Sequence, residues 1–245
     1  MIRAAALAAT LLAAVVLSAC ESTQDKAAKV RAAGEQALAG RKGLRITQLN
    51  KDVSVTGKTI LHDANGTAVV VELVNKGKQD EAQVPIGIEL TDAKGKKMFA
   101  NDAPGLEPAL VSMPLLPRDK DSFWVHNQII ATGVPAKLAV KVGLPKTTDV
   151  PAKPPHITLS DIKLDHDDSG AFVTGQVHNR SSVLQKRVTI FCIAKKGGKI
   201  IAAGRGVVDK LPPSPTPKPI RFSVYFIGNP AGGTLHFTVP PVVLR

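Results

Sequence analysis

The sequence predicts an all-β fold, with two antiparallel immunoglobulin-like β-sandwich domains in tandem after a signal peptide and a short helical spacer. Three observations support this fold. Short runs of Val, Ile, Thr and Leu, bounded by Gly, Asn, Asp and Pro, recur about every ten residues from Leu44 onward. Six such runs in each half are close to the number of strands that a sandwich needs. Hydrophobic residues make up 44% of the 245 residues, enough to fill a core in each half.

The N-terminus predicts a signal peptide over residues 1–19. Arg3 supplies a positive charge, and an apolar run, "AAALAATLLAAVVLSA", follows it and ends at Cys20. This run is shorter than the ~20 apolar residues of a membrane-spanning helix, and the polar stretch "ESTQDKAAK" comes directly after it. We therefore expect the segment to direct export and then to be removed.

The end of this segment, "LSAC" from Leu17 to Cys20, resembles the lipobox of bacterial lipoproteins. The resemblance implies cleavage before Cys20 and diacylation of its thiol; an ordinary secretory peptide with an incidental cysteine is the alternative. Two or more acyl chains hold a protein stably on a bilayer. The expected location is the bacterial cell envelope, where the chain is held to the membrane through lipidated Cys20 on the extracytoplasmic side.

Residues 20–43 are expected to form the lipidated N-terminus and a helical spacer. They are rich in Ala, Lys, Glu and Gln, with a thin apolar stripe that includes Val30 and Leu38. Gly43 suits the end of such a helix.

The first sandwich is expected over residues 44–145 and the second over residues 156–245, each with its own core. Between them, residues 146–155 form a Pro-rich linker that should be extended. The strands predicted in the first half are 53–61, 67–74, 83–90, 96–101, 121–129 and 136–143. Those in the second half are 156–164, 171–178, 186–194, 199–208, 219–227 and 233–239.

Residues 68–98 align without a gap with residues 171–201, which indicates an internal duplication. The alignment predicts that Gly95 and Gly198 lie in corresponding hairpin turns. The other matched pairs are Ala68 with Ala171, Val74 with Val177, Ile88 with Phe191, Leu90 with Ile193, and, further along, Phe123 with Phe222.

At the central strand of each half the sequence resembles the FxLYD domain, a small β-sandwich module of bacterial envelope proteins. "FCIAK" has the Phe at Phe191 and an aliphatic residue at Ile193, and "IELTD" has Leu90 and Asp92; neither half has the Tyr. The resemblance implies extracytoplasmic binding or structural use, without catalytic residues.

No catalytic or cofactor motif stands out in the sequence, so we expect no enzyme activity, no cofactor and no metal. The acidic stretch "DHDDSG", from Asp165 to Gly170, lacks the later acidic ligand of a calcium loop and predicts an Asp-rich hairpin turn. Cys192 lies in an apolar run and is expected to be a buried, inert thiol. The alternative function is an envelope hydrolase or metal-dependent enzyme with a site between the two domains.

Charge is unevenly divided along the chain, whose net charge is +12. Residues 152–245 contain thirteen Lys and Arg against five Asp and Glu, whereas residues 46–151 contain twelve of each. This asymmetry predicts attraction to an anionic lipid, an envelope polymer or an acidic protein; a solvated basic surface without a partner is the alternative. Nucleic acid is not expected, because aromatic residues are few. The candidate binding residues are Lys186, Arg187, Lys195, Lys196, Lys199, Arg205 and Lys210.

A second candidate surface is the apolar stretch over residues 103–120. If part of it is not core, it is the best candidate for a protein-binding surface. Its large apolar residues are Leu106, Leu110, Val111, Met113, Leu115 and Leu116. The expected function is therefore a non-catalytic binding or scaffold module, and a purely structural spacer is a further possibility.

Overall fold

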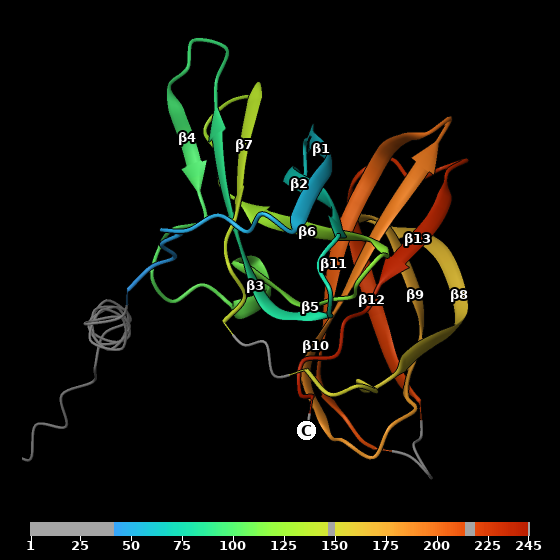
Figure 1. Cartoon of the computed structure of the whole chain (residues 1–245). Coiled ribbons are helices and arrows are strands. Elements are labelled where there is room, and N and C mark those ends of the chain that lie inside the picture. Colours follow the sequence, from blue (N-terminus) through green and yellow to red (C-terminus); the bar gives the residue numbers. More distant parts are fainter. Residues whose placement is uncertain (1–41, 147–149, 214–218, 245) are drawn as a thin grey trace, which may run out of the picture. The chain divides into compact units, whose positions relative to one another are not determined.

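The computed structural model describes residues 42–146, 150–213 and 219–244 (Figure 1). Within these residues the chain consists of antiparallel strands and one short 3-10 helix, without an α-helix, so the all-β prediction is confirmed. The predicted signal peptide, Cys20 and all but the last two residues of the predicted spacer lie outside the described residues. None of the described residues belongs to a helix long and apolar enough to cross a membrane.

The first half contains seven strands in two antiparallel sheets. In chain order the elements are β1 (Val53–Asp63), β2 (Gly66–Asn75), β3 (Glu81–Thr91), β4 (Lys97–Ala100), the 3-10 helix η1 (Pro108–Leu110), β5 (Ser112–Leu116), β6 (Asp121–Ile129) and β7 (Lys137–Val142). One sheet has the order β1-β2-β6, and in the other β3 pairs with β4, β5 and β7.

The second half contains six strands in one sheet. They are β8 (Ile157–Asp167), β9 (Gly170–Asn179), β10 (Gln185–Lys196), β11 (Lys199–Leu211), β12 (Ile220–Gly228) and β13 (Thr234–Thr238), in the order β13-β10-β11-β12-β9-β8. All twelve predicted strands are present, within a few residues of the expected bounds. The sequence missed β5, because Pro114 interrupts a run that has no polar alternation.

The two halves repeat one pattern of strand pairing. The order β1-β2-β6 corresponds to β8-β9-β12, and the pairs β3·β4 and β3·β7 correspond to β10·β11 and β10·β13. The second half differs because β11 also pairs with β12, at Ala202–Gly204, which joins its strands into one sheet. The shared pairing supports the duplication, and Gly95 and Gly198 both lie in the predicted turns with positive φ, at 86° and 77°.

The structure corrects the alignment of the two halves by one residue. The first hairpin of each half ends on the pairs Asp63 with Gly66 and Asp167 with Gly170, so equivalent residues from β1 to β3 differ by 104, and not by the 103 of the ungapped sequence alignment. Successive residues of a strand point to opposite faces of the sheet, so a shift of one residue exchanges the faces. The counterpart of Ile88 in the core is therefore Cys192, and Phe191 points to the other side.

Two buried asparagines confirm this correspondence. The side-chain amide of Asn75 donates to two carbonyl oxygens, and that of Asn179 donates to the two equivalent ones. Each amide thus ties the turn that follows its strand to the end of a later strand. The acceptors are Gln79 (2.9 Å) and Leu116 (3.2 Å) for Asn75, and Val183 (2.7 Å) and Leu211 (3.4 Å) for Asn179.

One insertion distinguishes the first half from the second. Ala100 and Leu116 pair with β3 as Ala203 and Leu211 pair with β10, but sixteen positions separate the first two residues and eight separate the second two. The single strand β11 therefore corresponds to β4 and β5, which are parted by residues 101–111. We call these residues the insertion. They include η1 and the first part of the apolar stretch 103–120.

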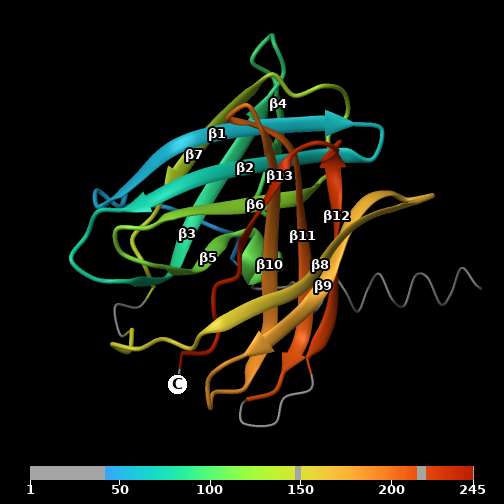
Figure 2. The same ribbon diagram turned by 90° about the vertical axis from the view of Figure 1, so that its right-hand side faces the viewer.

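The two halves pack against each other within one compact unit, residues 42–245. Strands β1, β2 and β6 cross the strands β10 to β12, as Figure 2 shows. Phe191, Ile193, Ala203 and Ile227 of the second half belong to the core cluster of the first half. A second cluster fills the inner side of the six-stranded sheet and contains Cys192. The first cluster is therefore shared by both halves.

One face of the β1-β2-β6 sheet is apolar because it packs against the strands of the second half. The equivalent face of β8, β9 and β12 does not pack against another sheet of the described residues, and it is polar. Val70 is fully buried, whereas its equivalent Thr174 is half-exposed; Phe123 and Val125 are buried, whereas their equivalents Arg221 and Ser223 are exposed. A polar end face is what stops a stack of repeats from continuing.

Candidate functional site

The insertion is fixed by buried hydrogen bonds. Asn101 accepts from the backbone N–H of Ile88 (2.8 Å) and donates to the carbonyl oxygens of Ile86 and Leu110 (both 2.8 Å). The indole N–H of Trp124 donates to the carbonyl oxygen of Ala109 (2.7 Å). Because each partner is buried, the insertion has a defined shape against β3 and β6.

The segment of residues 42–48 lies next to the insertion and crosses β3. Its end is joined to β7, where the backbone N–H of Asn50 donates to Val142 (2.9 Å). The side chain of Ile46 packs on Gly87, since a Cβ there would lie 3.2 Å from it. Gly43 passes so close to the insertion that a Cβ would come within 1.7 Å of the carbonyl oxygen of Asp102. Only glycine fits at this crossing.

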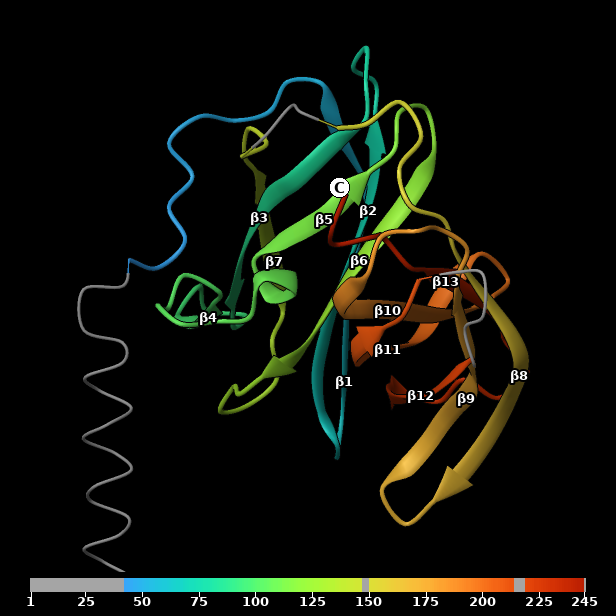
Figure 3. The ribbon, with the colours of Figure 1, turned by 90° about the horizontal axis from the view of Figure 1, so that it is seen from below.

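Between this segment and the insertion lies a cavity of about 710 Å³, which we call the N-terminal cavity. The C-terminal tail contributes to its wall, because Gln185 holds the backbone of Val242 (2.9 Å) and the tail passes β5 (Figure 3). The lining residues come from five parts of the chain: Lys42, Gly43, Leu44 and Arg45; Gln83 and Pro85; Ala103, Gly105, Leu106, Pro108, Val111, Ser112 and Pro114; Leu144, Pro145 and Lys146; and Val242.

The lining of the N-terminal cavity combines apolar walls with positive charge. Lys42, Arg45 and Lys146 are exposed basic residues, and the lining contains no Asp or Glu. Leu144 is 48% exposed, and Leu106 is half-buried. The cavity therefore offers apolar surface and unopposed positive charge in one place.

The two carboxylates of the insertion are engaged outside this cavity. Glu107 pairs with Arg187 and with Arg205 (2.9 Å) of the second half, and Asp102 pairs with Lys97 (3.5 Å). The Arg205 side chain is only 3% exposed, so its charge is largely withdrawn from water. The two pairs of Glu107 join the insertion to the second half.

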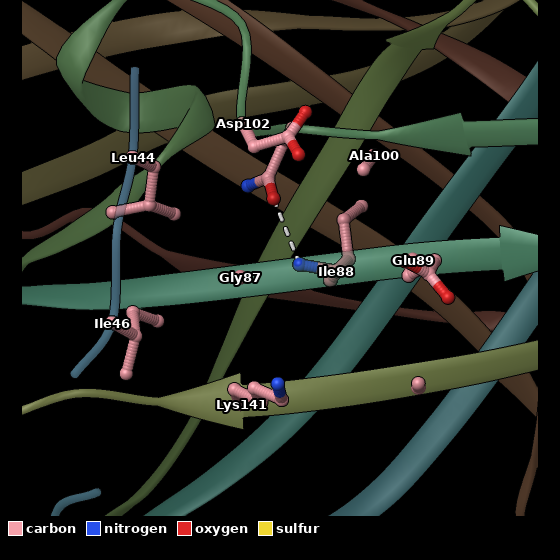
Figure 4. Close-up of a pocket in the computed structure, with 10 residues that line it drawn as sticks. Leu44, Ile46, Gly87, Ile88, Glu89, Ala100, Asp102 and Lys141 are labelled. Atoms are coloured by element: carbon pink, nitrogen blue, oxygen red, sulfur yellow. Dashed lines mark hydrogen bonds between the residues drawn. The ribbon is translucent and has the colours of Figure 1, made fainter. Parts of the chain in front are cut away.

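A smaller cavity of about 220 Å³ lies on the other side of residues 42–48. Figure 4 shows Leu44 and Ile46 at one end, with Asp102, Glu89 and Lys141 around the strand β3. Its two carboxylates both lie near Lys97, at 3.6 Å from Glu89 and 3.5 Å from Asp102. This cavity is smaller and has mixed charge, so it is the weaker candidate.

The seven basic residues predicted as one site do not lie together. Arg187 and Arg205 pair with Glu107, and Lys195 pairs with Glu72 (2.6 Å), so three of the seven bind carboxylates of the first half. The other four are exposed and lie in two pairs: Lys186 is opposite Lys210, and Lys196 is opposite Lys199.

These two lysine pairs are at opposite ends of the β10–β11 hairpin. Ten residues separate Lys186 from Lys196, which is ~33 Å at the rise of ~3.3 Å per strand residue. That distance exceeds the Debye length of ~8 Å at physiological ionic strength. A single anionic group can therefore contact only one of the two lysine pairs.

Of the six large apolar residues of the stretch 103–120, two are not core. Leu110, Met113, Leu115 and Leu116 are buried, whereas Leu106 and Val111 line the N-terminal cavity. The sequence therefore indicated one apolar wall of the N-terminal cavity. It did not indicate Lys42, Arg45 and Lys146, the basic residues that also line this cavity.

Cys192 is buried, as predicted, and desolvation raises the pKa of its thiol far above the ordinary value. The stretch Asp165–Gly170 forms the β8–β9 turn, as predicted, with Asp167 accepting from the Ser169 N–H (2.8 Å). Among the described residues, no group of three His, Cys, Asp or Glu could hold a metal ion.

His126 lies inside the shared core and is fully buried. Neither of its ring nitrogens has a hydrogen-bond partner among the described residues. The imidazole contacts the aromatic rings of Phe99 and Trp124 edge-on. Burial, with a smaller contribution from Arg205, lowers its pKa to about 3. Its equivalent in the second half is Val224, so the imidazole occupies an apolar position.

Comparison of the chain with models of protein families, with curated proteins and with solved structures finds no match.

Proposed function

We propose that this chain is a lipid-anchored, non-catalytic binding protein of the bacterial cell envelope, built from two duplicated immunoglobulin-like sandwich modules. The observation that carries the proposal is the N-terminal cavity, whose lining combines three basic residues with apolar walls and contains no Asp or Glu. Concave, mostly apolar sites with a few polar groups are where proteins bind small ligands. The repeated strand pairing supports the duplicated modules.

The position of the cavity along the chain fits the proposed anchor. Lys42, the first described residue, lines the cavity, and it follows Cys20 by 22 residues. At ~3.3–3.6 Å per residue, a chain of this length spans at most ~80 Å. The cavity therefore stays within that distance of the membrane to which Cys20 would be attached.

The positive charge of the cavity has a physical use at such a surface. Each basic side chain close to an anionic membrane contributes about 1 kcal/mol of attraction. Lys42, Arg45 and Lys146 would therefore orient this end of the chain towards anionic headgroups. The lysine pairs of the β10–β11 hairpin add weaker, separate contacts with anionic partners.

The enzyme alternative placed a site between the two domains. The charged groups that the structure describes there include the pairs of Glu107 with two arginines and of Glu72 with Lys195, and Asp63, which accepts from the backbone N–H of Gly228 (2.7 Å). Paired carboxylates of this kind hold the halves together, and no observation favours a catalytic role for them.

Metabolic labelling with a radioactive fatty acid tests the anchor. The wild-type chain should be labelled and should fractionate with membranes at high salt, and Cys20→Ser should lose both properties. Cys192→Ser is the matched control and should keep them, because that thiol is buried in the second core. Membrane retention of Cys20→Ser at high salt would refute the anchor.

A further inference from the structure

We infer that the N-terminal cavity binds an amphiphilic anion with a single acyl chain, such as a lysophospholipid with an anionic headgroup. This inference rests on the proposed function, because the envelope membrane is the source of such a molecule. Four features of the cavity indicate this class of ligand: its charges, its apolar walls, the residue types that it lacks, and its size.

The charges select an anion. Lys42, Arg45 and Lys146 line the cavity, and the nearby carboxylates of Asp102 and Glu107 are already paired with Lys97 and with two arginines. Within the lining itself, no Asp or Glu opposes these three positive charges. A phosphate or carboxylate group brought to these side chains gains charge-assisted hydrogen bonds.

The walls select an apolar tail. Leu44, Leu106, Val111, Leu144 and Val242 line the same cavity, together with four prolines. Leu144 leaves nearly half of its surface in water, and covering such surface is favourable at roughly 25 cal/mol per Å². A free phosphate ion would use the charges but would leave these walls exposed.

The residue types that are missing exclude other ligand classes. The lining has no Phe, Tyr or Trp on which a nucleobase could stack, and no Asp or Glu to bind a hard cation. Its volume of about 710 Å³ lies within the ~300–1,000 Å³ of small-molecule sites, which is too small for a folded partner. An anionic headgroup with one chain uses all that the cavity offers.

Calorimetric titration of the Cys20→Ser chain tests this inference, because that chain is free of its own lipid. The probes are monomeric lysophosphatidylglycerol, the zwitterionic lysophosphatidylcholine, and inorganic phosphate. We expect one lysophosphatidylglycerol per chain, bound at least tenfold more tightly than either of the other probes.

Two triple variants of equal charge change locate the site. Lys42→Glu/Arg45→Glu/Lys146→Glu should weaken the binding at least tenfold, whereas Lys186→Glu/Lys196→Glu/Lys199→Glu should leave it within about twofold. Leu144→Asn should weaken the binding of lysophosphatidylglycerol without changing the binding of phosphate. All six charged positions and Leu144 are exposed, so the variants should keep the wild-type melting temperature.

Equal binding of the anionic and zwitterionic lipids, or equal loss in both triple variants, would overturn the inference. Binding of phosphate as tight as that of the lipid would show an anion site without a place for a chain, and would overturn it too. These failures are distinguishable from failure of the anchor, which appears as a wild-type chain that takes up no fatty acid or as membrane retention of Cys20→Ser at high salt.

Discussion

Replacing Phe191 by Ala should destabilise both halves of the chain together. Phe191 lies on β10 of the second half, is fully buried, and belongs to the core cluster that contains Trp124 of the first half. Phe→Ala changes in cores cost about 3–5 kcal/mol, a large part of the ~5–15 kcal/mol that stabilises a typical domain. With a urea dependence of ~2–3 kcal/mol per M, the unfolding midpoint should fall by about 1–2.5 M.

The chain provides one spectroscopic or chemical probe in each half. Trp124 is its only tryptophan, and Cys192 is its only thiol once Cys20 is changed to Ser. Tryptophan fluorescence and pulsed alkylation of Cys192 should therefore report the same urea midpoint, and Phe191→Ala should shift both. Tyr225→Ala, which removes a 43% exposed aromatic residue on the polar end face, should cost less than about 1.5 kcal/mol. If the midpoints of Trp124 and Cys192 separate, and Phe191→Ala shifts only that of Cys192, the shared core is refuted.

Two further predictions concern the same core. His126→Val should remove an acid sensitivity: the folded pKa of about 3 lies below the ordinary 6.5, so stability is complete above pH 6.5 and falls as the pH drops, by about 3 kcal/mol at about pH 4.5. Urea midpoints measured at both pH values check this, and an unchanged pH dependence in the variant would contradict it. A protease site placed at residues 147–149 should yield two pieces that still elute together in size-exclusion chromatography, because residues 42–245 form one unit; separate elution of two folded pieces would contradict it.

The strands could be predicted from the sequence because each has its own local signal. Runs such as "TAVVVELV" and "KRVTIFCIA" are bounded by turn residues and lie at regular spacing, and the structure has strands at both. The exact register of the repeat could not be read in this way. On β10, the residues Thr189 to Ala194 are all buried because both faces are covered, so no alternation of polar and apolar residues shows which face is which.

The candidate site was only partly visible in the sequence. The unusual length and apolarity of residues 103–120 did point to Leu106 and Val111. The other walls come from residues 42–45, 144–146 and the C-terminal tail, which are far apart in sequence and have no motif. Likewise, the charge count suggested the second half, but Glu107 and Glu72, which pair with three of its basic residues, lie in the first. The difference in length between the two copies was the useful signal, since an insertion in one copy marks where that copy can form a surface of its own.

The most direct test of the proposed site is to find where a lipid lies on the chain. The Cys20→Ser chain is incubated with lysophosphatidylglycerol that carries a photoreactive group in its acyl chain, irradiated, digested and analysed by mass spectrometry. If the lipid binds in the N-terminal cavity, labels should appear on the peptides that contain Leu106, Val111 or Leu144, which form its apolar wall. Labels concentrated on the ends of the β10–β11 hairpin, near Lys186 or Lys199, or spread evenly over the chain would contradict it.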